Sequence, residues 1–119
     1  IEFKWNSNFP INSLNIMRGY ISVSKDKQND YLNCFFDAYW KDDQDLSNIE
    51  NISKLLSKLN INSDEFFASI KEQSIKDKLK KLTTDAFNKE VFGAPTFIVG
   101  SKMFFGQDRL EFVYREAKK

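Results

Sequence analysis

The segment 91–110 reads VFGAPTFIVGSKMFFGQDRL and contributes most to the assignment of the fold. It contains two short runs rich in β-branched and aromatic residues, 96–99 and 102–105, separated by a Gly-Ser pair at 100–101. A two-residue spacer that contains glycine is typical of a β-hairpin. Pro95 has no backbone N–H, so it suits the start of a strand or a sheet edge. The segment therefore predicts a hairpin that begins directly after a proline.

The residues before this hairpin, 1–90, repeat apolar side chains at helical rather than strand spacing. Residues 25–30 (KDKQND) are interpreted as a polar turn between the first two helices. Capping and charged residues mark the expected helix starts, which are Asn12 or Ser13, Asp30, Ser47, Asn62 and about Ser74. A last helix is expected from Asp108 to Ala117. The chain is thus predicted to be an α/β protein that is mostly α.

No segment upstream of the hairpin is a convincing partner strand for it. A two-stranded hairpin is marginally stable alone, so it needs further strands or a helical layer. We therefore predict two parts, a loop with a helical domain over 1–90 and a β-β-α part over 91–119. The sheet of the second part is expected to be incomplete.

Composition narrows the classes of partner. The 119 residues suit one domain, and 41% hydrophobic with 15% aromatic residues can form a packed core. The net charge of +1 gives no electrostatic reason to expect nucleic acid or an anionic membrane surface. No apolar run approaches the roughly 20 residues that cross a bilayer, and no signal peptide is recognised. Neither nucleic acid nor a membrane is expected as a partner.

Cysteine and histidine usage limits the chemistry. The chain has no histidine, which removes the commonest general base and the commonest metal ligand, so no metal site is predicted. Its one cysteine, Cys34, cannot form an intrachain disulfide or a Cys-x-x-Cys redox pair. Cys34 lies among aromatic residues and is expected to be an inert small hydrophobe. A reducing compartment such as the cytoplasm fits this usage best.

Four motifs together resemble a known family. They are GAPTF at 93–97, FFGQDRL at 104–110, FPINSLNIMRG at 9–19 and AYWKDDQDL at 38–46. This pattern is similar to that of the 2-hydroxychromene-2-carboxylate isomerases, which group with the kappa-class glutathione transferases and more remotely with the disulfide oxidoreductases. The resemblance implies a thioredoxin-like fold with an inserted helical domain.

The resemblance also implies that part of the fold is absent from this chain. Family members have an N-terminal β-α-β unit, which carries the serine that activates the glutathione sulfur and the strand that pairs with the hairpin. None of Ser7, Ser13 or Ser22 lies in that serine motif. No catalytic residue is therefore predicted on this chain. The expected partner is the missing N-terminal half or a second copy in a homodimer.

The Ala94-Pro95 bond is the first part of the implied glutathione site. The dipeptide alone favours a trans bond, since only about 5–6% of X-Pro bonds in folded proteins are cis. The resemblance instead implies a cis bond, with the backbone of Ala94 pairing with glutathione as an added strand. The alternative is that Pro95 only shapes a loop.

The start of the last helix is the second part of this site. Helix N-termini present free N–H groups and a partial positive charge, which favour carboxylates. The resemblance implies that the backbone near Phe105, Gly106 and Gln107 meets the γ-glutamyl carboxylate of glutathione, and that Asp108 meets its ammonium. Local sequence alone favours a simpler alternative, in which Asp108 caps its own helix.

The loop at 9–13 is the implied substrate-binding region. Ile11 and Asn12 match positions that line the substrate cleft of the family. Trp5 and Phe9 are candidates for aromatic walls of this cleft, with packing in the core as the equally supported alternative.

Three functions follow from the resemblance. The leading one is a glutathione-dependent isomerase acting on an aromatic ring-cleavage intermediate, to which this chain contributes the glutathione dock and part of the substrate cleft. The second is a kappa-type glutathione transferase or peroxidase. The third is a non-catalytic remnant that binds a thiol or a protein. A disulfide oxidoreductase is disfavoured, because the chain offers no dithiol.

Overall fold

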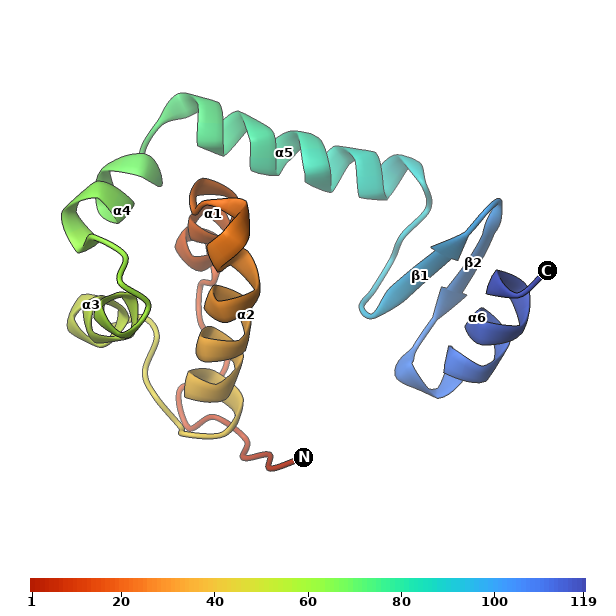
Figure 1. The fold of residues 1–119 in the computed structure, drawn as a ribbon, viewed down its shortest axis with the longest axis horizontal. Coiled ribbons are helices and arrows are strands. Elements are labelled where there is room, and N and C mark those ends of the chain that lie inside the picture. Colours follow the sequence, from red (N-terminus) through yellow and green to blue (C-terminus); the bar gives the residue numbers. More distant parts are fainter. The chain divides into compact units, whose positions relative to one another are not determined.

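A computed structural model describes all residues, 1–119. The chain forms two compact units, a helical unit at Ile1–Lys81 and a C-terminal unit at Leu82–Lys119, and one helix contributes residues to both. The elements in chain order are α1 (Leu14–Ser22), α2 (Lys25–Trp40), α3 (Ile49–Lys58), α4 (Ser63–Ser69), α5 (Gln73–Asn88), β1 (Thr96–Val99), β2 (Lys102–Phe105), a 3-10 turn (Gln107–Arg109) and α6 (Leu110–Ala117) (Figure 1).

The second helix begins earlier than expected. The interpretation of 25–30 as a polar turn is wrong, because α2 already begins at Lys25, directly after the extended residue Ser24. Lysine, aspartate and glutamine fit a helix well enough on a solvent-facing first turn. Asp26 also places a negative charge at the positive end of the helix. The chain therefore turns from α1 to α2 within two residues.

Asparagine side chains cap the next two helices. The expected cap at Ser47 is wrong by one residue, since Asn48 accepts hydrogen bonds from two backbone N–H groups in the first turn of α3. The Ser47 hydroxyl instead donates to the carboxylate of Asp45. The expected cap at Asn62 is confirmed, and its side chain accepts the N–H of Glu65 at 3.0 Å. These caps fix where α3 and α4 begin.

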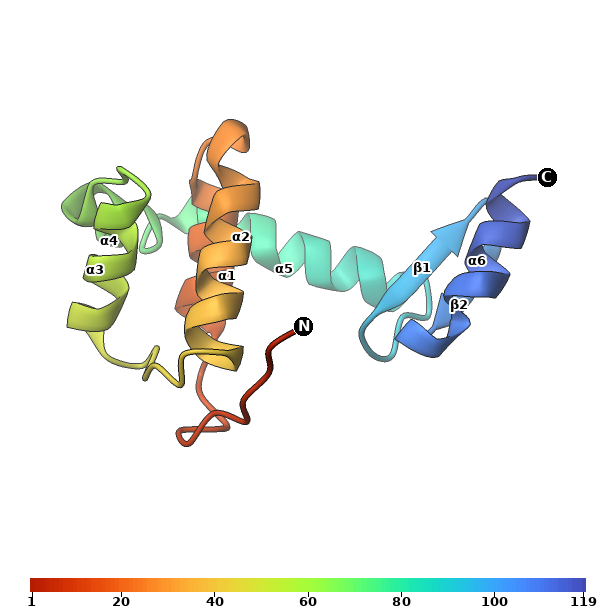
Figure 2. The same cartoon turned by 60° about the horizontal axis from the view of Figure 1, so that its bottom comes forward.

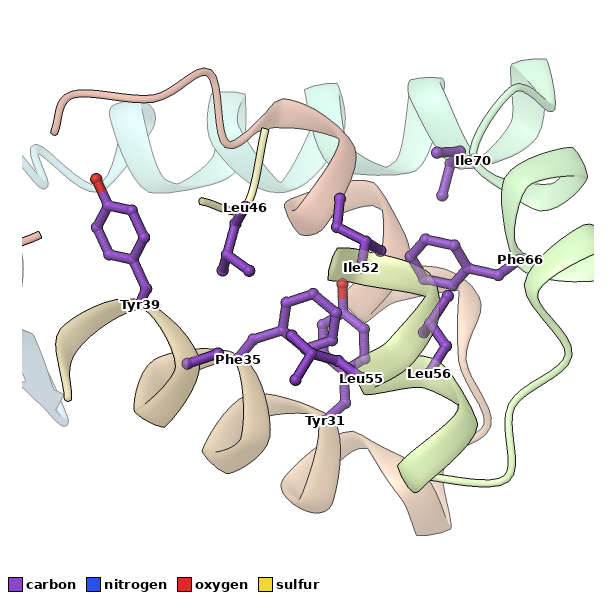
Figure 3. Close-up of a cluster of buried hydrophobic side chains, with 10 residues drawn as sticks. Tyr31, Phe35, Tyr39, Leu46, Ile52, Leu55, Leu56, Phe66 and Ile70 are labelled. Atoms are coloured by element: carbon purple, nitrogen blue, oxygen red, sulfur yellow. The ribbon is translucent and has the colours of Figure 1, made fainter. Parts of the chain in front are cut away.

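The helical unit closes around a core of buried hydrophobic side chains (Figure 3). The ring of Tyr31 stacks on that of Phe35 with centroids 4.2 Å apart, and the Tyr31 hydroxyl donates to the backbone carbonyl of Ile16. Gly19 lets α1 approach this core, because a Cβ there would lie 2.3 Å from the ring of Phe66. The members of the core are Tyr31, Phe35, Ala38, Tyr39, Leu46, Ile52, Leu55, Leu56, Phe66 and Ile70.

The C-terminal unit contains the predicted hairpin. Strands β1 and β2 are antiparallel, and the two-residue turn between them places Gly100 at φ 61°, a conformation that favours glycine. The expected cis bond at Ala94-Pro95 is confirmed, and Phe9-Pro10 is also cis. The sheet has two strands, as the sequence predicted. Helix α6 packs along β1 (Figure 2).

The two faces of this hairpin differ in burial. Phe97 and Phe104 lie opposite each other and are half-buried. Ile98, Met103 and Phe105 alternate with them along the strands and are exposed. One face of the sheet is therefore covered, whereas the other presents apolar side chains to solvent.

The last helix does not start as expected. Asp108 belongs to the 3-10 turn, and α6 proper begins at Leu110. In α6, Val113 and Glu116 are half-buried and the other side chains are exposed. One hairpin gives this amphipathic helix too small a surface to bury more of its apolar face.

Candidate functional site

The predicted glutathione-binding residues lie at one end of the hairpin. The N–H of Gly106 donates to the carbonyl of Pro95 at 2.9 Å, which places the residue after β2 opposite the residue before β1. Ala94 and Pro95 are exposed there, as is Gln107. The structure thus brings the two parts of the predicted site together.

Two glycines allow close packing at this end of the hairpin. Gly106 has φ 102°, and a Cβ there would lie 2.5 Å from Oδ1 of Asp108, so the carboxylate folds back over this glycine. A Cβ on Gly93 would lie 2.6 Å from the ring of Phe105. That ring also packs against Phe92, with centroids 4.7 Å apart. The exposed backbone around Ala94-Pro95 is therefore flanked by an aromatic ring and a carboxylate.

Asp108 is exposed and does not cap a helix. The 3-10 turn has Gly106 at its N-cap and α6 has Arg109, and neither start has a side-chain capping bond. The Asp108 carboxylate instead pairs with the guanidinium of Arg109 at 3.1 Å. An exposed pair of this kind is weak. The carboxylate is therefore accessible to a cation from solution.

The helical unit contains an apolar cavity of about 650 Å³. Phe9 and Ile11 line it from the loop before α1, Met17 from α1, and Phe36 and Trp40 from α2. Ligand pockets typically measure about 300–1,000 Å³ and are mostly apolar. The cavity therefore has the size and lining of a site for an aromatic molecule.

The two predicted substrate-binding residues have different positions. Ile11 lines the cavity, as a wall residue should. Asn12 is exposed and is not part of the lining, and its side chain accepts the N–H of Leu14 at 3.1 Å. In this structure Asn12 fixes the start of α1 rather than facing the cavity.

An aromatic cluster forms one wall of the cavity. Phe9 and Trp40 both line it, with ring centroids 6.0 Å apart. Trp5 packs on Phe9 at 4.6 Å and on Trp40 at 5.7 Å, and Phe3 stacks on Trp40 at 5.7 Å. Phe9, 47% exposed, lines the cavity, whereas Trp5, 60% exposed, packs on Phe9 and Trp40 without lining it.

A family model described as the DSBA-like thioredoxin domain matches residues 1–117. This chain belongs to the DsbA-like thioredoxin family. The predicted thioredoxin-like fold is therefore confirmed, with the helices and the C-terminal β-β-α part in the expected order.

Two relatives of this DsbA-like chain carry the name that the motifs suggested. A 2-hydroxychromene-2-carboxylate isomerase from Pseudomonas sp. (strain C18) is 30% identical over 92 residues, which cover 76% of this chain and 43% of the relative. A solved structure of a 2-hydroxychromene-2-carboxylate isomerase matches with a TM-score of 0.83 and 23% identity, covering 97% of this chain and 56% of the other. The DsbA-like chain thus spans about half the length of these relatives.

Three further side chains that could carry chemistry, Ser7, Ser22 and Cys34, have structural roles in this DsbA-like chain. The Ser7 hydroxyl donates to Asp43 and that of Ser22 to the carbonyl of Gly19. Cys34 is half-buried, and burial raises the pKa of its thiol, as expected for an inert cysteine. No cluster of metal-ligating side chains is present. None of the helices is both long and apolar enough to span a bilayer.

Sequence analysis missed one feature of the helical unit. Asp43, in the loop after α2, binds residues of the N-terminal segment, a contact that the sequence did not predict. The partners are more than thirty positions apart in sequence, so no local pattern connects them. The only local signal is an aspartate in a polar loop after a helix, where a left-handed conformation is common.

Proposed function

We propose that this chain is part of a glutathione-dependent isomerase of the 2-hydroxychromene-2-carboxylate isomerase type. The observation that supports it best is the gathering of Ala94, Pro95 and the 105–108 turn at one end of the hairpin. The resemblance predicted these residues as a single binding site. The 30% identity to a curated isomerase supports the same assignment.

The C-terminal unit supplies the glutathione dock. The exposed backbone of Ala94 pairs with the extended peptide of glutathione as a short added strand. The γ-glutamyl carboxylate meets N–H groups at the start of the 3-10 turn, and the ammonium meets the Asp108 carboxylate. The carboxylate and the ammonium are attached to the same carbon of the γ-glutamyl residue, so pairing both groups orients this end of glutathione.

The helical unit supplies the pocket for an aromatic substrate. In the reaction, the glutathione sulfur forms a bond to an alkene carbon conjugated with a carbonyl, and the π electrons move to the carbonyl oxygen. The former double bond rotates as a single bond, and expulsion of the thiolate restores the alkene in its other geometry. In this scheme the residues of this chain bind and orient glutathione and the substrate.

The thiolate-activating group comes from a complementary β-α-β half, on the same protein or on another chain. The hairpin has the edge for it. Because the pair Pro95 and Gly106 is hydrogen-bonded, the main-chain groups of Thr96 and Ile98 point to the outer edge of β1. Strand β1 has no charged side chain, so an added strand can pair with this edge and continue the sheet. Glutathione chemistry of this type needs a reduced thiol, so we place the protein in the cytoplasm.

Turnover tests this function. The chain joined to its complementary half should convert 2-hydroxychromene-2-carboxylate, followed by absorbance, only when glutathione is present. The 119-residue chain alone should give no turnover. Conversion without glutathione in the joined protein would remove the proposal.

A second candidate function is that of a binding module, since the candidate site on this chain consists of docking residues, Ala94, Pro95 and the 105–108 turn. As a binding module it would hold a thiol or a protein without turnover. Glutathione binding by the joined protein, with neither isomerisation nor conjugation, identifies this case.

A further inference from the structure

The carboxylate of Asp43, in the loop after α2, makes three contacts with the N-terminal arm, residues 3–9. Asp43 Oδ1 accepts the backbone N–H of Ser7 at 2.7 Å, and Oδ2 accepts the Ser7 hydroxyl at 2.6 Å. The ammonium of Lys4 lies 3.2 Å from Oδ2. One side chain thus binds two residues of the arm through three contacts.

The backbone of Asp43 is shaped for this role. Its φ of 54° lies in the left-handed region, which aspartate, asparagine and glycine adopt more readily than other residues. This conformation follows the end of α2 directly and points the carboxylate at the arm. The hydrogen bonds from Ser7 and the charge of Lys4 lower the pKa of Asp43 to about 2, so the carboxylate is charged at neutral pH.

Asn6 provides a second, buried attachment of the arm. Its Nδ2 donates to the carbonyls of Tyr39 at 2.8 Å and Gln44 at 2.9 Å, and the side chain is 1% exposed. The N–H of Lys4 also donates to the carbonyl of Trp40 at 2.7 Å. The arm is therefore held close to the last turn of α2 along its length.

Through Phe9 the arm contributes to the aromatic wall of the cavity. Phe3, Trp5 and Phe9 come from the arm, and they surround Trp40 of α2. The buried core of the helical unit contains no arm residue except the polar Asn6. Releasing the arm therefore changes the cavity wall without opening the core.

We propose that Asp43 is a positioning residue for ligand binding: it holds the arm so that Phe9 and Trp40 form the wall on which a planar aromatic ligand packs. The ligand class is a flat aromatic molecule, because the lining of the cavity is mostly apolar and aromatic. The ligand part rests on the function proposed above, whereas the positioning part rests on the contacts alone.

Tryptophan emission tests the positioning part. The chain has two tryptophans, Trp5 and Trp40, and both lie in the cluster, so all tryptophan emission reports on the arm. Asp43→Gly keeps the left-handed backbone and removes the carboxylate. Its emission should shift to the red while far-UV circular dichroism stays unchanged. Asp43→Asn keeps an acceptor for Ser7 and should lie between wild type and Asp43→Gly.

Affinity for 2-naphthoate, measured by calorimetry on the 119-residue chain, tests the ligand part. We expect Asp43→Gly to bind at least about tenfold more weakly and Asp43→Asn about two- to threefold more weakly than wild type. Asp42→Gly is the matched control, since no contact of the Asp42 carboxylate with the arm is seen. It should match wild type in both measurements.

A second variant covers the case in which Asp43→Gly loses helicity. Combining Lys4→Met with Ser7→Ala leaves Asp43 in place and removes two of its three contacts. It should shift emission in the same direction by a smaller amount. Unchanged emission in Asp43→Gly, or in this double variant if Asp43→Gly unfolds, overturns the positioning role. Shifted emission without any naphthoate binding by wild type supports the positioning role and counts against the proposed function.

Discussion

The two units of this chain differ in how much of their own apolar surface they bury. The helical unit buries ten hydrophobic side chains in one cluster from α2, α3, α4 and the loop between α2 and α3. In the C-terminal unit, residues 82–119, every residue is half-buried or exposed. The helical unit therefore has the core of an independent fold, whereas the C-terminal unit presents its apolar side chains to whatever binds it.

The same difference separates the two proposed binding sites. The cavity lies inside a unit with its own core, so its shape is set by this chain. The glutathione dock lies on a hairpin with one uncovered face and a free strand edge. We infer that the cavity exists in the chain alone and that the dock becomes rigid only when a complementary half covers the hairpin.

The largest expected effect is a core truncation in the helical unit. Leu56 is 0% exposed, and Leu→Ala at such a site typically costs about 2–5 kcal/mol. The control is Leu110→Ala in the C-terminal unit, where the side chain is 52% exposed and the cost should be within about 0.5 kcal/mol. Urea denaturation followed by circular dichroism measures both. Equal costs would mean that the units do not differ as described.

Overpacking at Gly19 should lower the free energy of unfolding by less than the truncation of Leu56. In Gly19→Ala the new methyl group meets the ring of Phe66, and overpacking of this kind costs about 1–3 kcal/mol. Gly100→Ala is the comparison in the C-terminal unit. Nothing lies within 4 Å of a Cβ there, so only backbone strain of about 1–2 kcal/mol acts, and it acts on the hairpin. Denaturation of the helical unit should respond to the first variant and not to the second.

Capping comes next in size. Asn48→Ala removes two accepted hydrogen bonds at the start of α3 and should lower the free energy of unfolding by about 1 kcal/mol. Ser47→Ala, one residue before, leaves the cap intact and should cost less. If Ser47→Ala proved the more destabilising of the pair, the cap assigned here would be wrong.

Asp108 tests the dock in the joined protein. Asp108→Asn should weaken glutathione binding about fivefold, which corresponds to about 1 kcal/mol. The effect is modest because the carboxylate is exposed and already pairs with Arg109. Melting curves without ligand should coincide, since Asp108 caps no helix. Equal affinities in calorimetry would leave Asp108 without a role in binding.

The smallest effect is acid release of the arm. The folded-state pKa of Asp43 is about 2, below the usual value of about 3.9. Its contribution to stability is therefore fully present above about pH 4 and is lost as the pH falls toward 2.

Tryptophan emission should accordingly stay constant from pH 7 to about 4 and shift between about pH 4 and 2. In Asp43→Asn this transition should be much reduced. A full transition in that variant would assign it to another group or to global unfolding instead.

Local features of this structure were predictable from sequence. The two-residue turn Gly100-Ser101 fixes which residues of the two strands pair, so both strands were predicted at the correct positions. The start of α2 was not predicted correctly, because residues 25–30 contain no apolar side chain that could show helical spacing. The cap at Asn48 was missed by one position, because Ser47 is an equally good local candidate.

Contacts between distant segments were not predictable. The cavity is built from residues 9–46, and no single helix pattern reveals it. The bonds between Ser7 and Asp43 join the chain before α1 to the loop after α2, so they depend on how α1 and α2 pack. The gathering of Ala94 with the 105–108 turn was predicted from the resemblance, and the hairpin register accounts for it.

Amide hydrogen exchange, followed by NMR on the 119-residue chain, tests the central claim most directly. We predict that the amides of Leu55 and Leu56 in α3 exchange slowly, with protection close to the full free energy of unfolding. The hydrogen-bonded amides of Phe97 and Phe104 in the hairpin should exchange much faster, and they should become protected when the complementary half is joined. Equal protection of the hairpin and α3 in the chain alone would contradict the account, because the C-terminal unit would then need no partner.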